Sequence, residues 1–472
     1  MRILIIHFRS APAADLGDVS ACVDPLDSAG TDGVSLEIVK RQTILEEMGH
    51  EVKICSAYNW ADFPVEGLEF ESEEVVQMVQ ALFGPEVLDS AGEIFLKKDF
   101  YEARVVLKKK LSKVVDGYRP DLLFVHNMLC LPIHPVATVS LTELVRERRL
   151  PCVAIHHDVL SEGAYKFTPT CAFAESILQD YYPPTIPNLS HWTINTRNRR
   201  ALADRGVDAR IIHDSMDFDH VLDPDERVMI RAKLRAKYGI AAEDVVLLAA
   251  ARIVPNKQTE LAGRLTSVLQ GLRQEPTGKK LYNGEELSQT SRTILVLAGR
   301  PERSFAEYQK SLFQLFDELE IDWIYVGEAV RPRRCADDDL HALYPDVYSM
   351  ADLVLYPTGW EGFGNQLLEA FAAELPVAVF EYPVFQEDIA PRGVTVVTLG
   401  DKLSPITDKT GLVNVPREVL NRAAQEIMEI LTDPQRYRSI IEQNVIVGRR
   451  SFGFDVLRAH LSDAIHWASD LA

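Results

Sequence analysis

Residues 351–379 read ADLVLYPTGWEGFGNQLLEAFAAELPVAV, and their pattern decides the fold. An aliphatic run at 353–356 is followed by a turn that contains Gly362 and Gly364, then by a helical spacing of apolar residues, and then by a second aliphatic run at 377–379. This order is typical of a parallel sheet covered by helices. The stretch therefore predicts part of a doubly wound α/β domain.

Short aliphatic runs bounded by turn residues recur on both sides of this stretch. In the first half of the chain we expect strands in the segments 2–8, 50–57, 120–127, 151–158, 191–196 and 209–214. In the second half we expect them in the segments 244–253, 293–300, 321–327, 351–358, 376–382 and 394–400. Helical patterns, such as those from Ser35 and Thr142, separate several of these runs, which predicts two similar parallel sheets with both faces covered.

The chain has 472 residues, which is too long for one hydrophobic core. A polar, proline-bearing stretch at 214–224 reads as a linker. We expect three parts: an N-terminal domain at 1–218, a C-terminal domain at 219–425, and a helical segment at 426–472 that packs back on the first domain. Residues 273–292 are polar and poor in core residues, so we expect an exposed insertion there.

Charge and composition exclude several classes of protein. The chain has 50 Lys and Arg against 70 Asp and Glu, a net charge of −20, which argues against a general nucleic-acid binder. No run reaches the ~18 apolar residues of a membrane-spanning helix. The N-terminus reads as a strand and not as a secretory leader, so we expect a cytoplasmic protein. The six cysteines lack zinc-like spacing, so we expect reduced core thiols and no metal site built from them.

The turn after the run at 353–356 has the composition of an anion site. Gly362 and Gly364 permit close approach of the backbone, and the free N–H groups at the start of the next helix favour a phosphate. Glu361 lies in the turn and Glu369 about two helical turns further on, where each could accept hydrogen bonds from sugar or ribose hydroxyls. The alternative is a pair of solvated charges at a helix end.

Positive charge comes from the segment ARIVPNK at 251–257. Arg252 ends a predicted strand, and Lys257 follows in the next loop. Ligands of open parallel sheets bind at the carboxyl ends of strands, so these two side chains are candidates for clamping a diphosphate. A solvated pair at the strand end is the competing interpretation.

Polar side chains also end two predicted strands of the first half. His126 and Asn127 end one strand, and His156, His157 and Asp158 end the next. Imidazoles at this edge could bond a sugar hydroxyl or hold an acceptor, whereas a histidine satisfied by neighbouring backbone is equally frequent.

A second anion site is predicted where Gly33 begins a helix after the long loop that starts at Arg9. No GxGxxG fingerprint follows the first strand, so a nicotinamide-dependent dehydrogenase is not favoured.

Two basic runs have open interpretations. Residues 97–113 hold seven basic side chains against two acidic ones, which fits a solvated helix face or a membrane-surface helix. The run RPRR at 331–334 follows a predicted strand and reads either as part of a nucleotide or phosphate site or as a solvated loop.

The segments EGFGNQLLEA and ARIVPNK together resemble the retaining nucleotide-sugar glycosyltransferases of family 4, whose GT-B fold has two facing Rossmann-like domains. The resemblance implies that Arg252 and Lys257 bind the donor diphosphate, that Glu361 binds sugar hydroxyls and that Glu369 binds the ribose. It assigns the remaining positions as follows: Val326 and Gly327 at the base, Gly362, Phe363, Gly364 and Asn365 at phosphate or sugar, Gly33 at the diphosphate, His157 or His156 beside the donor sugar, and His126, Asn127, His156 and Asp158 at the acceptor.

Within that family, FEYPVFQEDI from Phe380 together with HHD at 156–158 resembles the mannosylglucosylglycerate synthases, which use GDP-mannose to make a compatible solute. The chain departs from many family members in having His213, Asp214 and Ser215 before the linker, where they carry Pro, Asn and Gly.

The resemblance implies transfer of mannose or glucose, with retained configuration, from GDP-mannose or UDP-glucose to a small soluble hydroxyl acceptor. No bound cofactor is required, Mg²⁺ is compatible with the reaction, and the chain could form a homo-oligomer. The competing functions are a GT-B disaccharide phosphorylase and a catalytically silent protein that binds sugar nucleotides.

Overall fold

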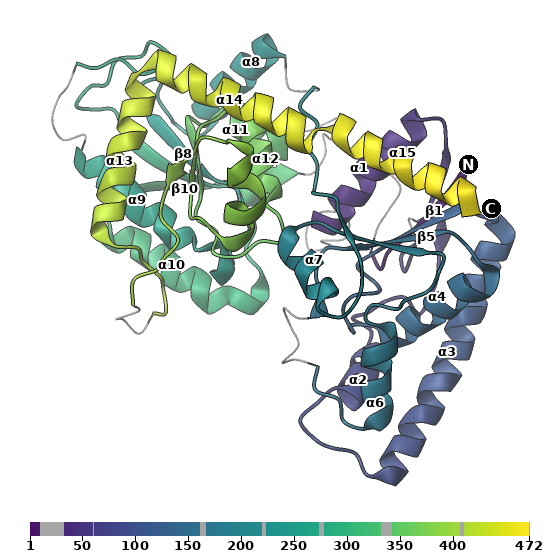
Figure 1. The fold of residues 1–472 in the computed structure, drawn as a ribbon. Coiled ribbons are helices and arrows are strands. Elements are labelled where there is room, and N and C mark those ends of the chain that lie inside the picture. Colours follow the sequence, from purple (N-terminus) through teal and green to yellow (C-terminus); the bar gives the residue numbers. More distant parts are fainter. Residues whose placement is uncertain are drawn as a thin grey trace. The chain divides into compact units, whose positions relative to one another are not determined.

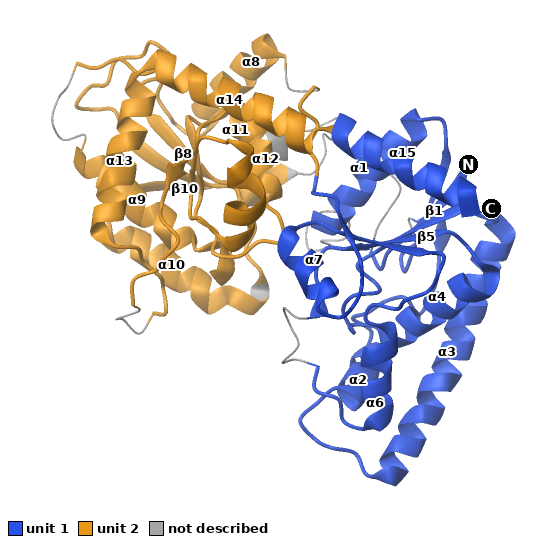
Figure 2. Ribbon diagram, viewed as in Figure 1, with its two compact units in different colours: residues 1–214, 455–472 blue, residues 215–454 orange. Residues whose placement is uncertain are grey.

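A computed structural model describes residues 1–9, 33–59, 61–160, 167–219, 223–272, 278–331, 342–405 and 410–471. The chain divides into two compact units (Figures 1 and 2). Unit 1 comprises residues 1–214 and 455–472, and unit 2 comprises residues 215–454.

Unit 1 is built on a seven-stranded sheet in the order β3-β2-β1-β4-β5-β6-β7, with every pair parallel. Its strands are β1 (Arg2–Ile6), β2 (Glu51–Ser56), β3 (Phe63–Pro64), β4 (Leu122–His126), β5 (Cys152–His156), β6 (Leu189–Thr193) and β7 (Arg210–Ile211). The central strands β4 and β5 are buried along their whole length, as expected for a sheet covered on both faces. The strand order reverses between β1 and β4, which defines the switch point of this sheet.

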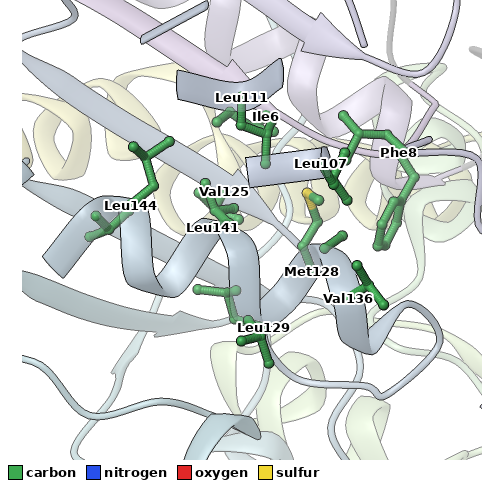
Figure 3. Close-up of a cluster of buried hydrophobic side chains, with 14 of the residues drawn as sticks. Ile6, Phe8, Leu107, Leu111, Val125, Met128, Leu129, Val136, Leu141 and Leu144 are labelled. Carbon is green, nitrogen blue, oxygen red and sulfur yellow. The ribbon is translucent and has the colours of Figure 1, made fainter. Parts of the chain in front are cut away.

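The helices of unit 1 cover this sheet. They are α1 (Gly33–Glu47), α2 (Glu73–Leu82), α3 (Ser90–Tyr118), α4 (Pro135–Arg148), α6 (Ala172–Tyr181), α7 (Thr196–Ala203) and α15 (Phe454–Leu471). Figure 3 shows Ile6 and Val125 of the sheet gathered with Leu107 and Leu111 of α3 and Leu141 of α4 in one buried cluster. The apolar spacing along α3 and α4 therefore fixes one covered face of the sheet.

Unit 2 repeats the scheme with the order β10-β9-β8-β13-β14-β15, again entirely parallel. Its strands are β8 (Val245–Ala249), β9 (Thr293–Leu297), β10 (Asp322–Tyr325), β13 (Leu353–Tyr356), β14 (Val377–Val379) and β15 (Val397–Thr398), and a separate two-stranded sheet pairs β11 (Val330–Arg331) with β12 (Ala342–Leu343). Each of the twelve segments expected to hold a strand does so. The switch point of this sheet lies between β8 and β13.

The helices of unit 2 flank this sheet. The α-helices are α8 (Pro224–Lys237), α9 (Thr259–Leu272), α10 (Ala306–Glu318), α11 (Tyr344–Ser349), α12 (Asn365–Ala372), α13 (Arg417–Thr432) and α14 (Pro434–Phe452). Shorter helical turns are η3 (Pro255–Lys257), η4 (Arg303–Phe305), η5 (Gly327–Ala329), η6 (Phe385–Ile389) and η7 (Ala390–Arg392).

A buried carboxylate ties β13 into this unit. Asp352 accepts hydrogen bonds from the Val246 amide at 2.7 Å and from the guanidinium groups of Arg231 and Arg235. The pairing of β13 with β8 is therefore reinforced by ionic contacts at the start of the strand.

The C-terminal helical segment breaks at Asp433 and Gly453, which are the C-caps of α13 and α14. Residues 426–454, which we expected to leave the second domain, belong to unit 2, and only α15 belongs to unit 1. An aromatic contact helps to hold α14 in unit 2, because the Tyr437 ring of α14 stacks on Tyr282 with centroids 3.7 Å apart.

Residues 278–292, the described part of the exposed insertion expected at 273–292, lie between α9 and β9, and most of them are exposed. Tyr282 joins the stack on Tyr437, and Leu281 and Leu287 are buried in the core of unit 2. Leu281, Tyr282 and Leu287 anchor this otherwise exposed segment to unit 2. Within the described ranges, none of the helices is both long and apolar enough to span a membrane.

Candidate functional site

The switch point of unit 2 brings Lys257 and Glu361 together. Lys257 ends η3 after β8, and Glu361 lies in the loop after β13. The Lys257 ammonium donates a hydrogen bond to Oε1 of Glu361, and the Tyr356 hydroxyl donates to the same oxygen at 2.7 Å. Both side chains of the ion pair are largely buried, at 6% and 14% exposure. Burial and the neighbouring Glu361 raise the pKa of Tyr356, so its phenol stays protonated and donates.

The two loops that carry this pair are fastened to each other. The Gly359 amide and the Thr358 hydroxyl both donate to the carbonyl of Asn256, at 2.9 and 3.2 Å. A Cβ atom on Gly359 would lie 2.2 Å from Nε2 of Gln258, so a larger residue here would displace the Gln258 side chain. The fastening fixes the separation of Lys257 and Glu361.

The start of α12 is an uncapped helix N-terminus. Gly364 precedes it with φ 136°, and no side chain caps the first turn. A Cβ atom on Gly364 would lie 2.3 Å from the hydroxyl of Tyr382, which donates at 2.7 Å to the carbonyl of Phe363. The backbone at Gly364 is therefore held in a shape that only glycine adopts easily, next to N–H groups suited to an anion.

Glu369 and Asn365 lie on α12 itself. The Tyr348 hydroxyl donates to Oε2 of Glu369 at 2.7 Å. The Oδ1 atom of Asn365 is buried, and it finds no hydrogen-bond partner among the described residues.

Arg252 is not brought to the Lys257 and Glu361 pair. Its guanidinium bonds to Glu302, and its side chain is 64% exposed. The expected cluster of two cations is therefore, in this structure, one buried lysine and one solvated arginine.

The segment at Val326 and Gly327 begins η5, after β10. Arg300 donates to the carbonyls of Gly327 and Val330, at 3.4 and 3.0 Å. A Cβ atom on Gly327 would lie 2.6 Å from the Tyr325 ring. Our sequence analysis missed Arg300, although its place at the end of the run TILVLAGR matches that of Arg252 after β8.

In unit 1, the edge at β4 and β5 carries two separate histidine pairs. Nδ1 of His126 lies 3.3 Å from Nε2 of His157, and Nε2 of His156 lies 2.9 Å from Nδ1 of His191 on β6. His156 and His157 therefore contact different partners. Burial lowers the pKa of His126, His156 and His157 well below the ordinary value, and the charge of Arg41 adds to the effect for His126 and His157, so these imidazoles are neutral.

Asn127 organises the turn after β4 from a left-handed conformation with φ 55°. Its Oδ1 accepts the amides of His157 and Asp158 at 3.1 and 3.0 Å, and its Nδ2 donates to Oδ2 of Asp158 at 2.8 Å. Asp214 approaches the other side of His157, with 3.9 Å between Oδ1 and Nδ1. Burial raises the pKa of both carboxyl groups.

A buried ion pair on α1 adds charge to this cluster and was missed by our sequence analysis. Nη1 of Arg41 bonds to Glu37 at 2.8 Å, and both side chains are fully buried. Nε and Nη2 of Arg41 find no partner within the part of the chain that the structure describes. Its charge contributes to lowering the pKa of His126 and of His157. The spacing of four residues on a helix was the available signal.

Two expectations fall partly outside the described residues. Gly33 is the first residue of α1, but the loop before it, at 10–32, lies outside them. Most of the RPRR run also lies outside, at 332–334. Among the described residues, no group of three or more His, Cys, Asp and Glu is arranged to hold a metal ion.

Two doubly wound parallel sheets followed by C-terminal helices are the GT-B architecture of glycosyltransferases, and solved structures agree. Sucrose-phosphate synthase from Thermosynechococcus elongatus matches with a TM-score of 0.60 at 15% identity, covering 100% of both chains. Anabaena Alr3699/HepE in complex with UDP and glucose matches with a TM-score of 0.54 at 15% identity, covering 99% of both chains. The α/β GT-B fold expected from the sequence is confirmed.

Sequence comparison identifies the family. Residues 230–445 match the family described as glycosyl transferases group 1. The chain is 33% identical over 472 residues to mannosylglucosylglycerate synthase of Thermotoga maritima, covering 98% of this chain and 99% of the relative. It is 28% identical over 431 residues to mannosylglucosylglycerate synthase of Petrotoga mobilis, covering 91% of this chain and 97% of the relative. The chain belongs to the group 1 glycosyltransferases.

Proposed function

We propose that this glycosyltransferase moves a hexosyl group, mannose or glucose, from a nucleotide-diphospho-sugar to a small hydroxyl acceptor of the glucosylglycerate type, with retention of anomeric configuration. The observation that carries the proposal is the buried Lys257 and Glu361 pair at the switch point of unit 2, close in sequence to the uncapped start of α12. The names of the relatives from Thermotoga maritima and Petrotoga mobilis support the acceptor class.

On the donor side, Lys257 and Glu361 have capacity left for a ligand. An ammonium group has three N–H donors, and Lys257 gives one to Glu361, so two can reach phosphate oxygens. Both described bonds to Glu361 go to Oε1, which leaves Oε2 to accept a sugar hydroxyl. We assign the ribose to Glu369 and the base to the turn at Val326 and Gly327.

Arg252 would supply the second cation. Its ion pair with Glu302 is exposed, and exposed pairs contribute little stability. Exchanging Glu302 for a phosphate is therefore inexpensive. The amides of the Gly362–Asn365 turn would complete the anion site, and a divalent ion such as Mg²⁺ would supplement these charges without being required.

The reaction needs charge stabilisation more than it needs a nucleophile. The bond between the sugar C1 and the diphosphate oxygen breaks, the acceptor oxygen bonds to C1 on the same face, and the acceptor proton passes to the departing phosphate oxygen. Lys257 and Arg252 act on negative charge that grows as the first bond breaks, so their contribution is larger in the transition state than in the ground state.

On the acceptor side, unit 1 offers neutral imidazoles and an organised amide. His157 and His126 can bond hydroxyl groups, with Asn127 and Asp158 fixing the turn between them. Arg41 keeps two N–H groups without described partners in the same cluster, which suits an acceptor that carries a carboxylate.

A donor and acceptor screen tests this function. GDP-mannose, UDP-glucose and ADP-glucose are each incubated with glucosylglycerate, glycerate or glycerol, with and without Mg²⁺, and release of the nucleoside diphosphate is measured. We expect release with a glycerate-containing acceptor and a product whose anomeric configuration, read by NMR, equals that of the donor. Sugar release driven by inorganic phosphate would instead identify a phosphorylase, and donor binding without any release would identify a silent binding protein.

A further inference from the structure

Helix α3 has an apolar face that the described residues of unit 1 leave exposed. Its buried side chains, such as Leu96, Phe100 and Leu107, pack toward α4 and the sheet. Figure 1 shows α3 beside α4 along one side of unit 1. Four large apolar side chains on the other side are exposed by more than half of their surface: Ile94 at 66%, Phe95 at 67%, Val105 at 56% and Val106 at 56%.

These four residues form one surface. At 100° per residue, they fall within about 120° of each other around the helix and opposite the buried stripe. Lys98 and Glu102 lie in the middle of the same face, with side chains 66% and 68% exposed. Their own contact is long, at 3.9 Å, so both charges remain available. We refer to these six residues as the α3 outer face.

The α3 outer face is symmetric about Phe100. Ile94 and Val106 lie six positions before and after it, Phe95 and Val105 five, and Lys98 and Glu102 two. In an antiparallel pair of identical helices related by a two-fold axis, each position lies level with the position equally far on the other side of the axis. Residues at the centre of the face meet that position directly, and residues on one flank meet the partner residue of the same flank at nearly the same level. Each apolar residue then meets an apolar residue, and each charge meets the opposite charge.

We propose that the α3 outer face is a homodimer interface in which two copies of the chain pack α3 against α3 in antiparallel orientation. Ile94 packs on Val105 of the partner subunit, and Phe95 packs on Val106 of the partner subunit. Lys98 pairs with Glu102 of the partner subunit, and the two-fold axis repeats each contact. The self-complementary order of charges favours a second copy over other occupants.

The same face is poorly suited to a lipid surface. Most basic side chains of the segment 97–113 are already engaged: Lys97 with Glu93, Arg104 and Lys108 with Glu143, and Lys110 with Glu66. The outer face itself carries one acid for one base at its centre. Lys109 and Lys113 are exposed further along the same side of the helix, which gives three lysines without an engaged partner among the described residues, whereas recognition of anionic lipid typically uses clusters of about 4–8 basic groups. One helix pair is a small interface, so we expect a weak dimer, with a Kd on the order of 10 µM.

Analytical ultracentrifugation of the full chain between about 1 and 100 µM tests the interface. The wild-type mass should rise with concentration from 53.0 kDa toward twice that value. Lys98→Glu and Glu102→Lys should each weaken association at least about tenfold, because each places like charges opposite one another. The double variant Lys98→Glu/Glu102→Lys should restore it to within about threefold, since the order of charges is again complementary.

A matched control distinguishes the interface from general hydrophobicity. Val228 on α8 is exposed by 65%, which is comparable to Ile94. Val228→Asp should leave the mass unchanged, whereas Ile94→Asp should give a monomer with the wild-type unfolding temperature. Four outcomes would each overturn the proposal. The wild type could stay at 53.0 kDa at the highest concentration, or the double charge swap could fail to restore association. Val228→Asp could lose association as much as Ile94→Asp does, or a monomeric wild type could bind phosphatidylserine vesicles while Ile94→Asp does not.

Discussion

The ammonium group of Lys257 and the carboxylate of Glu361 are bonded to each other although 104 residues separate them in the chain. The contact exists because β8 and β13 are neighbours at the switch point of unit 2, so the loops after both strands leave the same edge of the sheet. The pair is buried and also bonded by Tyr356, which restricts it to one geometry.

Lys257→Ala should reduce transfer about 10²- to 10³-fold in kcat, because a preorganised cation at the leaving group is lost. Initial rates at saturating donor measure the effect, and circular dichroism checks that the fold is retained. Lys310→Ala, which removes an exposed lysine of α10, is the matched control and should keep wild-type turnover. Turnover of the Lys257 variant within threefold of wild type would refute the proposed role.

Arg252→Ala should separate activity from stability. Its ion pair with Glu302 is exposed, so the free energy of unfolding should change by less than about 0.5 kcal/mol. If Arg252 binds the donor diphosphate, kcat/KM for the donor should fall about tenfold. Glu302→Gln frees the guanidinium and should leave kcat/KM for the donor equal to or above the wild-type value. A fall in kcat/KM for the donor in both variants would show that activity depends on the ion pair itself.

Gly364→Ala should destabilise the protein by about 1–3 kcal/mol, because alanine resists φ 136° and its Cβ would meet the Tyr382 hydroxyl at 2.3 Å. The double variant Gly364→Ala/Tyr382→Phe removes the clashing oxygen and should recover part of the loss. Chemical denaturation measures the free energy of unfolding of the single and the double variant. Gly271→Ala is the control, since nothing lies within 4 Å of a Cβ atom there. Equal stability of the two alanine variants would contradict the strained turn.

Acidification should destabilise unit 1 through its buried histidines. Burial lowers the pKa of His191 from 6.5 to about 4, so the folded state resists protonation. Its contribution to stability is fully present above pH 6.5 and is lost as the pH falls from 6.5 through about 4, by up to about 1.4 kcal/mol per pH unit. Urea denaturation at pH 7.5, 6 and 5 should show a shallower decline in His191→Gln than in wild type. Identical slopes would mean that His191 does not carry this effect.

Much of the fold is predictable because strands and helices leave local patterns. Aliphatic runs bounded by turn residues identified β8 and β13, and the helical spacing of apolar residues after Gly364 identified α12. Shorter strands such as β3, with two residues, carry too little pattern to be recognised.

The site was less predictable, because its contacts join distant segments. Lys257 and Glu361 were expected in the loop and in the turn that follow two strands, but their mutual bond depends on the order of strands in the sheet, which no single segment encodes. The bond from Tyr348 to Glu369 and the partner of Arg252 depend on packing in the same way. The assignment of donor, sugar and acceptor roles to these residues stays a prediction.

The division of the chain at 214 and again at 454 has a consequence for how the protein is made. Unit 2 is one uninterrupted stretch, so it can fold as soon as that stretch leaves the ribosome. Unit 1 begins first but receives α15 only after all of unit 2 has been synthesised, so its final packing step is delayed until late in translation.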